Sequence, residues 1–322
     1  FPEWGEPVER IGALFRELDD QPGLLLFLEG YLRSGIEESQ KINALFELAE
    51  IYENTAGREI EALKYYRELL LLGHSRVEVL RRMERILRST ERLEEHLGIV
   101  SQLVELGYSN SDLLEDSIRQ GNLLERLERY EEAFKTYRSA LLKKREFPAA
   151  IAGLESLAER GVHVLEVAQA LEPIYTARQE NEKLAEILLK RVDFSDGKSK
   201  RKALLRRIGD IYENRLGSPS RAFEMARRSL AEDPSDMGVR MWIEKLAVDA
   251  KSEEKLAWAY VEEASSCEKK VALQLHRRAA NCFFEQLGQF ENASLQYLAI
   301  LELRPGDEAS RERLERCYRE LE

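Results

Sequence analysis

The sequence predicts an all-α protein, an α-solenoid of consecutive helix pairs, from three observations. A pattern of one small residue, a ring or leucine three positions later and an alanine twelve or thirteen positions after the small residue returns four times. Such self-similarity is typical of repeat architectures. Charged residues make up 34% and hydrophobic residues 43% of the chain, as expected for a helical array. No segment indicates a sheet.

The repeated residue types predict how each helix pair packs. A small residue in the first helix lets the second helix approach, the ring fills the space beside this contact, and the alanine completes it. The fourth copy is one residue shorter. The copies are Ala49, Tyr52, Gly57 and Ala62; Gly209, Tyr212, Gly217 and Ala222; Ala280, Phe283, Gly288 and Ala293; and Gly121, Leu124 and Ala133.

Glycines and prolines mark where these helices end. Gly57, Gly217 and Gly288 fall between the two helices of a pair, where glycine adopts the left-handed conformation that ends a helix. Pro234 and Pro305 each follow the small residue by 25 positions (209 + 25 and 280 + 25) and cannot continue the second helix.

These motifs resemble tetratricopeptide repeats. The segments 205–234 (LRRIGDIYENRLGSPSRAFEMARRSLAEDP) and 275–305 carry the small residue, the aromatic residue and the closing proline of that family, with one extra residue in the turn and no consensus tryptophan. The phrases LEPIY, KLAEILLKRV and IYEN…LG resemble long arrays from Gram-negative bacteria. The resemblance covers most of residues 38–322 and implies a right-handed superhelix that binds proteins.

The repeat rhythm predicts the organisation of the chain into roughly 17–18 helices. Small positions recur in double repeats of 71 or 72 residues, but Ala158 and Gly209 are 51 residues apart, about one helix too many. This surplus either bends the array or forms a three-helix repeat.

At the amino-terminal end we predict capping helices at 7–18 and 22–34. The predicted parts are a cap (1–37), a first block (38–161), an extra-helix segment (162–198) and a second block with a C-terminal helix (199–322).

The sequence gives no sign of catalysis. Cys267, Cys282 and Cys317 have no paired spacing, and the four histidines are far apart. No zinc-protease, nucleophile-elbow or phosphate-loop motif occurs. We expect no catalytic residue, no cofactor and no metal.

Charge argues against other partner classes. The net charge of −11 disfavours nucleic acid despite the local KSKRKALLRR segment. No apolar run is long enough to span a membrane, so no membrane insertion is expected. The chain begins at Phe1 without methionine, so a targeting signal could be missing; we expect a bacterial, cytoplasmic protein.

Partner-binding residues are expected on the inner face, which the first helices of the pairs line. Their mixture of amides, arginines, acids and aromatics suits binding of a peptide, although an ordinary solvated face has the same composition. The candidates are Phe46, Glu50, Asn54, Asn122, Arg126, Arg206, Asp210, Asn214, Arg277, Asn281 and Phe284.

The arginines at 206 and 277 occupy equivalent positions, since 206 + 71 is 277. They predict a common surface for an acidic partner segment, unless each pairs with a neighbouring acid such as Asp210. Asn122 and Asn281 resemble the asparagines of the family's carboxylate-clamp subclass but lack its lysines.

The sequence thus predicts a scaffold or adaptor that binds another protein, either a peptide segment or a small globular regulator such as a GTPase. Two alternatives stay open: an architectural spacer that self-associates, and the non-catalytic arm of a larger enzyme.

Overall fold

The computed structural model describes residues 5–107 and 110–322, which form eighteen α-helices and two π-helical turns and contain no strand. The chain divides into two compact units, Phe1–Glu159 and Arg160–Glu322. Residues 1–4 of the predicted cap lie outside the described part of the chain.

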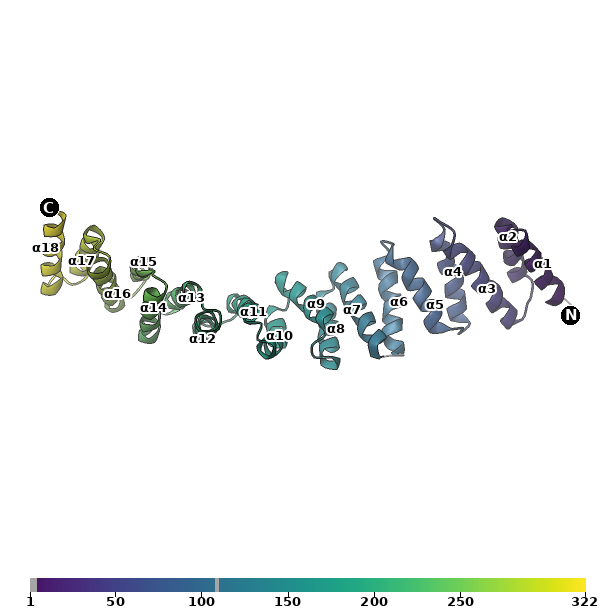
Figure 1. The fold of residues 1–322 in the computed structure, drawn as a ribbon, viewed down its shortest axis with the longest axis horizontal. Coiled ribbons are helices and arrows are strands. Elements are labelled where there is room, and N and C mark those ends of the chain that lie inside the picture. Colours follow the sequence, from purple (N-terminus) through teal and green to yellow (C-terminus); the bar gives the residue numbers. More distant parts are fainter. Residues whose placement is uncertain (1–4, 108–109) are drawn as a thin grey trace. The chain divides into compact units, whose positions relative to one another are not determined.

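The described residues of the first unit, 5–107 and 110–159, form nine helices in chain order (Figure 1). They are α1 (Gly5–Glu17), α2 (Gln21–Arg33), α3 (Glu38–Glu53), α4 (Glu59–Leu71), α5 (Arg76–Arg88), α6 (Leu93–Leu106), α7 (Asn110–Arg126), α8 (Tyr130–Lys143) and α9 (Pro148–Glu159).

The second unit also contains nine helices, two of which continue into a π-helical turn. They are α10 (Val164–Arg178), α11 (Asn181–Asp193), α12 (Lys198–Asp210) with η1 (Ile211–Arg215), α13 (Pro219–Glu232), α14 (Met237–Asp249), α15 (Glu253–Ala264), α16 (Lys269–Asn281) with η2 (Cys282–Gln286), α17 (Phe290–Leu303) and α18 (Glu308–Leu321).

Each unit is a succession of helix pairs followed by one last helix, which confirms the predicted fold class. In the first unit α1 to α8 form four pairs, and α9 packs on α8 and α7. In the second unit α10 to α17 form four pairs, and α18 packs on α17. The two helices predicted within residues 162–198 are present as α10 and α11, and they pack against each other. The four-part division of the chain stays a prediction.

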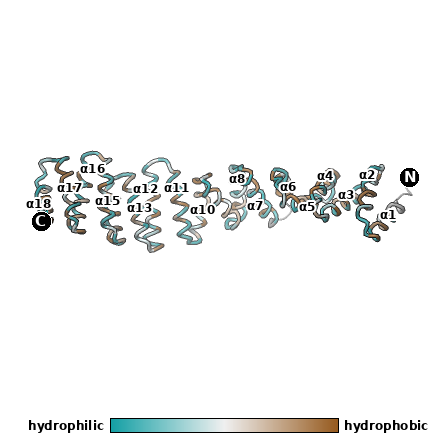
Figure 2. The backbone as a smooth tube through the Cα atoms, turned by 90° about the horizontal axis from the view of Figure 1, so that it is seen from above, coloured by the Kyte–Doolittle hydropathy of each residue, from teal (hydrophilic) through white to brown (hydrophobic). Residues whose placement is uncertain are grey.

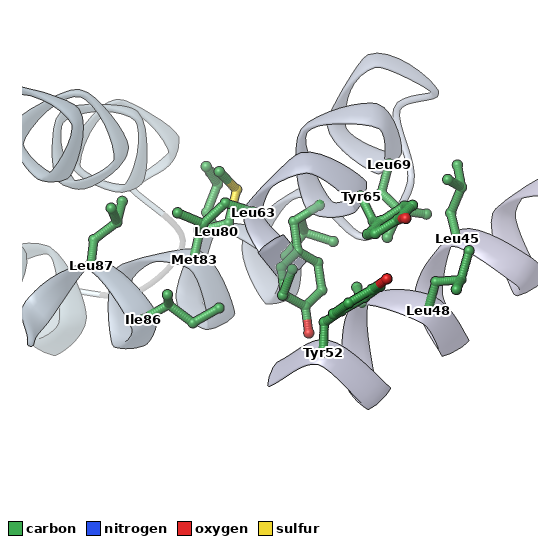
Figure 3. Packing of buried hydrophobic residues seen from close by; sticks show 14 of the residues in the cluster. Leu45, Leu48, Tyr52, Leu63, Tyr65, Leu69, Leu80, Met83, Ile86 and Leu87 are labelled. Atoms are coloured by element: carbon green, nitrogen blue, oxygen red, sulfur yellow. The ribbon is translucent and has the colours of Figure 1, made fainter. Parts of the chain in front are cut away.

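The predicted packing residues form the interior of the pairs. Ala49 and Ala62 are fully buried where α3 meets α4, and Ala222 and Ala293 are fully buried in their own pairs. In the pair of α3 and α4 the rings of Tyr52 and Tyr65 stack with centroids 5.4 Å apart (Figure 3). Leucines such as Leu45, Leu48 and Leu69 surround these rings (Figure 3). The repeat pattern therefore identified the core correctly.

The turns inside the pairs adopt the predicted conformation. Gly57, Gly217 and Gly288 have φ angles of 79°, 58° and 64°, which a residue with a Cβ atom rarely adopts. Helices α13 and α17 end two residues before Pro234 and Pro305. These positions confirm how the sequence marks helix ends.

The extra residue relative to the repeat consensus is accommodated within the first helix. The N–H of Leu216 donates to the carbonyl oxygen of Ile211 at 3.0 Å, and the N–H of Leu287 donates to that of Cys282 at 3.1 Å. Both bonds span five residues, so the last turn is π-helical and holds one more residue than an α-helical turn.

Candidate functional site

The first helices of successive pairs in the second unit, α12, α14 and α16, form a row that α18 extends. Figure 2 shows helices of this unit, among them α11, α13, α15 and α17, running side by side. A polar contact links each helix of the row to the next. Lys202 contacts Asp236 at 2.6 Å between α12 and the start of α14, Arg240 contacts Gln274 at 2.8 Å between α14 and α16, and Arg277 contacts Asp307 at 2.8 Å between α16 and the start of α18. The row therefore presents a surface built from residues 30 or more positions apart in sequence.

An apolar stripe runs along the exposed side of α14 in this row. Met237, Met241 and Val248 are 62%, 59% and 62% exposed. Their spacings of four and seven residues place them on one helix face. We call these three residues the α14 stripe. Exposed apolar residues that share one face of a helix mark a surface that another molecule can cover.

A groove of about 540 Å³ lies between α12 and α14. Ala203, Arg206, Val239 and Trp242 are among the residues that line it. The guanidinium of Arg206 lies 4.3 Å from the centre of the Trp242 ring, a cation–π arrangement. The indole is buried against α12, because Gly209 leaves room for it. The groove thus has an aromatic wall and an exposed cation at its edge.

The equivalent arginines Arg206 and Arg277 differ in their surroundings. Arg206 stacks on Trp242, whereas Arg277 donates to Asp307 Oδ1 at 2.8 Å. Asp210 is not a partner of Arg206 in an ion pair; it accepts a hydrogen bond from Asn214 Nδ2 at 2.7 Å. Of these predicted residues, Arg206 therefore keeps a charge with no carboxylate within 4 Å among the described residues.

The other candidates of the second unit lie near the end of α16. Asn281 Oδ1 accepts a long hydrogen bond, 3.4 Å, from the hydroxyl of Tyr297. Phe284 in η2 packs edge-on against Phe290, with centroids 5.3 Å apart, and the guanidinium of Arg313 lies 5.2 Å from the centre of the Phe284 ring. Asn281 and Phe284 therefore contribute to packing among the last helices of the unit.

Two candidates in the first unit converge on one arginine of α5. Glu50 on α3 lies 2.8 Å from Arg82 Nη2, and the Arg82 guanidinium lies 4.9 Å from the centre of the Phe46 ring. His74 approaches the same ring edge-on at 6.3 Å. Asn54, at the end of α3, is exposed. Phe46 and Glu50 are thus held by contacts within the unit.

Asn122 and Arg126 lie on α7. The Tyr137 hydroxyl lies 2.7 Å from both Asn122 Oδ1 and Glu125 Oε1, so Asn122 supports the packing of α8. Arg126 is exposed, and no described carboxylate lies within 4 Å of its guanidinium. The structure therefore does not bring the first-unit candidates together into one cluster.

Sequence reasoning missed Met237, Met241, Val248 and Trp242. It considered inner-face residues only in the four helices with the full repeat pattern, and α14 lacks that pattern. A usable signal was present, because residues 237, 241 and 248 form an apolar face on the side of α14 opposite the buried Leu246.

The described residues offer little for metal or thiol chemistry. Among them, no group of three or more His, Cys, Asp or Glu is placed to hold a metal ion. Burial raises the pKa of the Cys282 thiol to about 11, so it stays protonated at neutral pH.

Within residues 5–107 and 110–322, no helix has both the length and the apolar character needed to cross a membrane.

No protein-family model and no curated protein matches the sequence. Several solved structures are similar to it. A tetratricopeptide repeat protein from Parabacteroides merdae is 14% identical over 97% of this chain and 98% of its own, with a TM-score of 0.33. A thermophilic repeat protein from Thermus thermophilus is 15% identical over 64% and 98%, with a TM-score of 0.23. The P58(IPK) repeat domain is 14% identical over 98% of both chains, with a TM-score of 0.26. Each of these three structures is described as a tetratricopeptide repeat protein or domain.

Proposed function

We propose that the chain is a scaffold that binds another protein through the surface formed by α12, α14 and α16. The observation that carries this proposal is the α14 stripe, whose three side chains are each more than half exposed. Covering them would remove apolar surface from water, the main favourable term in protein association. The groove lined by Arg206 and Trp242 adds a concave site for an anchoring side chain.

The proposed partner is a peptide segment or a small globular regulator, for which a GTPase is one candidate class, and the proposed setting is the bacterial cytoplasm. A row of parallel helices with a stripe along its middle member suits an elongated ligand. Arg206 on α12, stacked on Trp242 of α14, favours an acidic ligand, and we propose that the equivalent Arg277 on α16 does so as well.

The test is a cross-linked pull-down from the source cell, followed by mass spectrometry, with wild type and two variants. Met241→Glu places a charge in the middle of the stripe. Leu142→Glu is the matched control, because Leu142 is 82% exposed on α8, outside this surface. We expect one partner to be retained by wild type and by the control and lost with Met241→Glu. If Met241→Glu retains the partner as well as wild type does, and its helical content is unchanged, the proposal is contradicted.

A further inference from the structure

Arg240 is a buried arginine that lacks an acidic partner. It lies on α14 beside the stripe and is only 6% exposed. Nη1 donates to the side-chain oxygen of Gln274 at 2.8 Å, and Nη2 donates to the carbonyl oxygen of Ser235 at 3.1 Å. Nε has no hydrogen-bond partner among the described residues, and no described carboxylate lies within 4 Å of this guanidinium. A buried cation without a counter-ion is costly unless a ligand supplies the missing charge.

The preceding repeat shows which group this position accommodates. Lys202 on α12 is equivalent to Arg240, because both precede the small residue of their helix by seven positions (209 − 7 and 247 − 7). Lys202 Nζ lies 2.8 Å from Asp233 Oδ2 and 2.6 Å from Asp236 Oδ2. In that repeat the chain itself provides two carboxylates. At Arg240 it provides only two neutral oxygens.

Nearby acids do not fill this role. Glu268 immediately precedes α16, just as Asp236 immediately precedes α14. Unlike Asp236, which pairs with Lys202, Glu268 forms no ion pair with Arg240 in the described part of the chain. Glu244, one turn along α14, is engaged by Arg278 and by the hydroxyl of Tyr260. An anion for Arg240 must therefore come from outside the unit.

We propose that Arg240 binds a carboxylate of the partner segment that covers the α14 stripe. This inference rests on the proposed function and adds the chemistry of the ligand: an apolar segment with one acidic group. The planar guanidinium offers paired donors to a carboxylate. Gln274, whose side chain is exposed, is the group that the incoming carboxylate replaces. The carboxylate is either a side chain or the carboxyl terminus of the segment.

The experiment uses short fluorescent peptides and the full chain. Each peptide has two leucines four positions apart, matching Met237 and Met241, and one glutamate. A second set has glutamine in place of glutamate, and each set is made with a free and with an amidated carboxyl terminus. Anisotropy then gives the affinity for wild type, Arg240→Gln and Lys202→Gln.

We expect wild type to bind a carboxylate-bearing peptide at least about tenfold more tightly than the neutral one, because the contact pairs a buried charge. Arg240→Gln should lose this preference. Lys202→Gln should keep it, because the acids beside Lys202 belong to the chain. Binding of amidated glutamate peptides identifies a side-chain ligand, and binding only of free-acid peptides identifies a chain terminus.

A second measurement separates binding from structure. Arg240→Met removes an unpaired buried charge and should raise the melting temperature while abolishing the preference for the acidic peptide. A large fall in melting temperature would show that Arg240 is a structural residue and would overturn the inference. Equal affinity of wild type for every peptide, or no binding of any, overturns it as well. The pull-down with Met241→Glu still decides the proposed function independently.

Discussion

A Cβ atom on Gly209 of α12 would lie 2.3 Å from Cζ2 of Trp242 on α14. The small residue is therefore required by the first helix of the next pair, in addition to the second helix of its own. Gly121 shows a related constraint, since its Cβ would lie 2.3 Å from the Tyr137 ring on α8. Gly153 on α9 approaches the same ring, where a Cβ would come within 2.5 Å. Aromatic rings thus determine where these helices need glycine.

Gly209→Ala should destabilise the second unit by about 1–3 kcal/mol, because the buried indole has to shift. The control is Gly98→Ala on α6, where a Cβ atom would have no neighbour within 4 Å among the described residues. That variant should gain up to about 1 kcal/mol from the higher helix propensity of alanine. Urea denaturation measures both changes. A neutral Gly209→Ala would show that the contact with Trp242 relaxes freely.

Ala222→Leu and Ala293→Leu should each cost about 1–3 kcal/mol, because both alanines are fully buried between the helices of a pair. Ala231→Leu tests the substitution at an exposed position of α13 and should change stability by no more than about 0.5 kcal/mol. Thermal denaturation of the three variants checks the ranking. Equal melting temperatures for all three would contradict the close helix contact.

A buried carboxylate links α5 and α6 in the first unit. Glu84 is 3% exposed and accepts hydrogen bonds from Arg88 at 2.8–3.2 Å, and His96 Nε2 lies 3.4 Å away. Burial alone would raise the pKa of Glu84, but hydrogen bonds with His96 and Arg88 outweigh burial and lower the pKa to about 2. The folded state therefore favours the ionised carboxylate.

This lowered pKa predicts how stability depends on pH. Glu84 should contribute stability that is fully present above its unfolded pKa of about 4.5 and is lost as the pH falls toward about 2. Glu84→Gln should destabilise α5 and α6 at neutral pH, by on the order of 3 kcal/mol. The difference between wild type and variant should shrink between pH 4.5 and pH 2. Amide hydrogen exchange in α5 and α6 measures the stability of these helices in wild type and in the variant. A stability difference that does not change with pH would contradict the prediction.

Replacing Arg206 and Arg277 together by glutamate should abolish binding of an acidic partner. The two changes reverse the charges at equivalent positions of α12 and α16 and introduce repulsion toward an acidic ligand. The two single variants should differ in their affinity for the acidic partner, because their surroundings differ. Arg277→Glu also places a second acid beside Asp307, whereas Arg206→Glu removes a cation from Trp242. Affinity at low and moderate salt, together with helical content, provides the test. Unchanged affinity at both salts would move the search to Phe46, Asn54 and the first unit.

The sequence alone determined the helix pairs, their interior and their turns. Ala49, Ala62 and Gly57 were predictable because the contacts that need them form within one pair, between residues close in sequence, and the same spacing recurs. Because these contacts recur at the same spacing in several pairs, the residues that they require can be recognised in the sequence. The π-helical turn is the exception, since the extra residue was evident but its accommodation at Ile211–Arg215 depended on hydrogen bonding in the folded chain.

Only the tertiary structure decided which charged residues have partners. Arg206 and Arg277 occupy equivalent repeat positions, yet one stacks on a tryptophan and the other pairs with an aspartate, while Arg240, at a different repeat position, is buried without an acid in the described chain. Each outcome depends on side chains 30 to 36 residues away (242 − 206, 274 − 240 and 307 − 277) on a neighbouring helix. Those neighbours differ from repeat to repeat, so the repeat pattern fixes where an arginine lies but not what neutralises it.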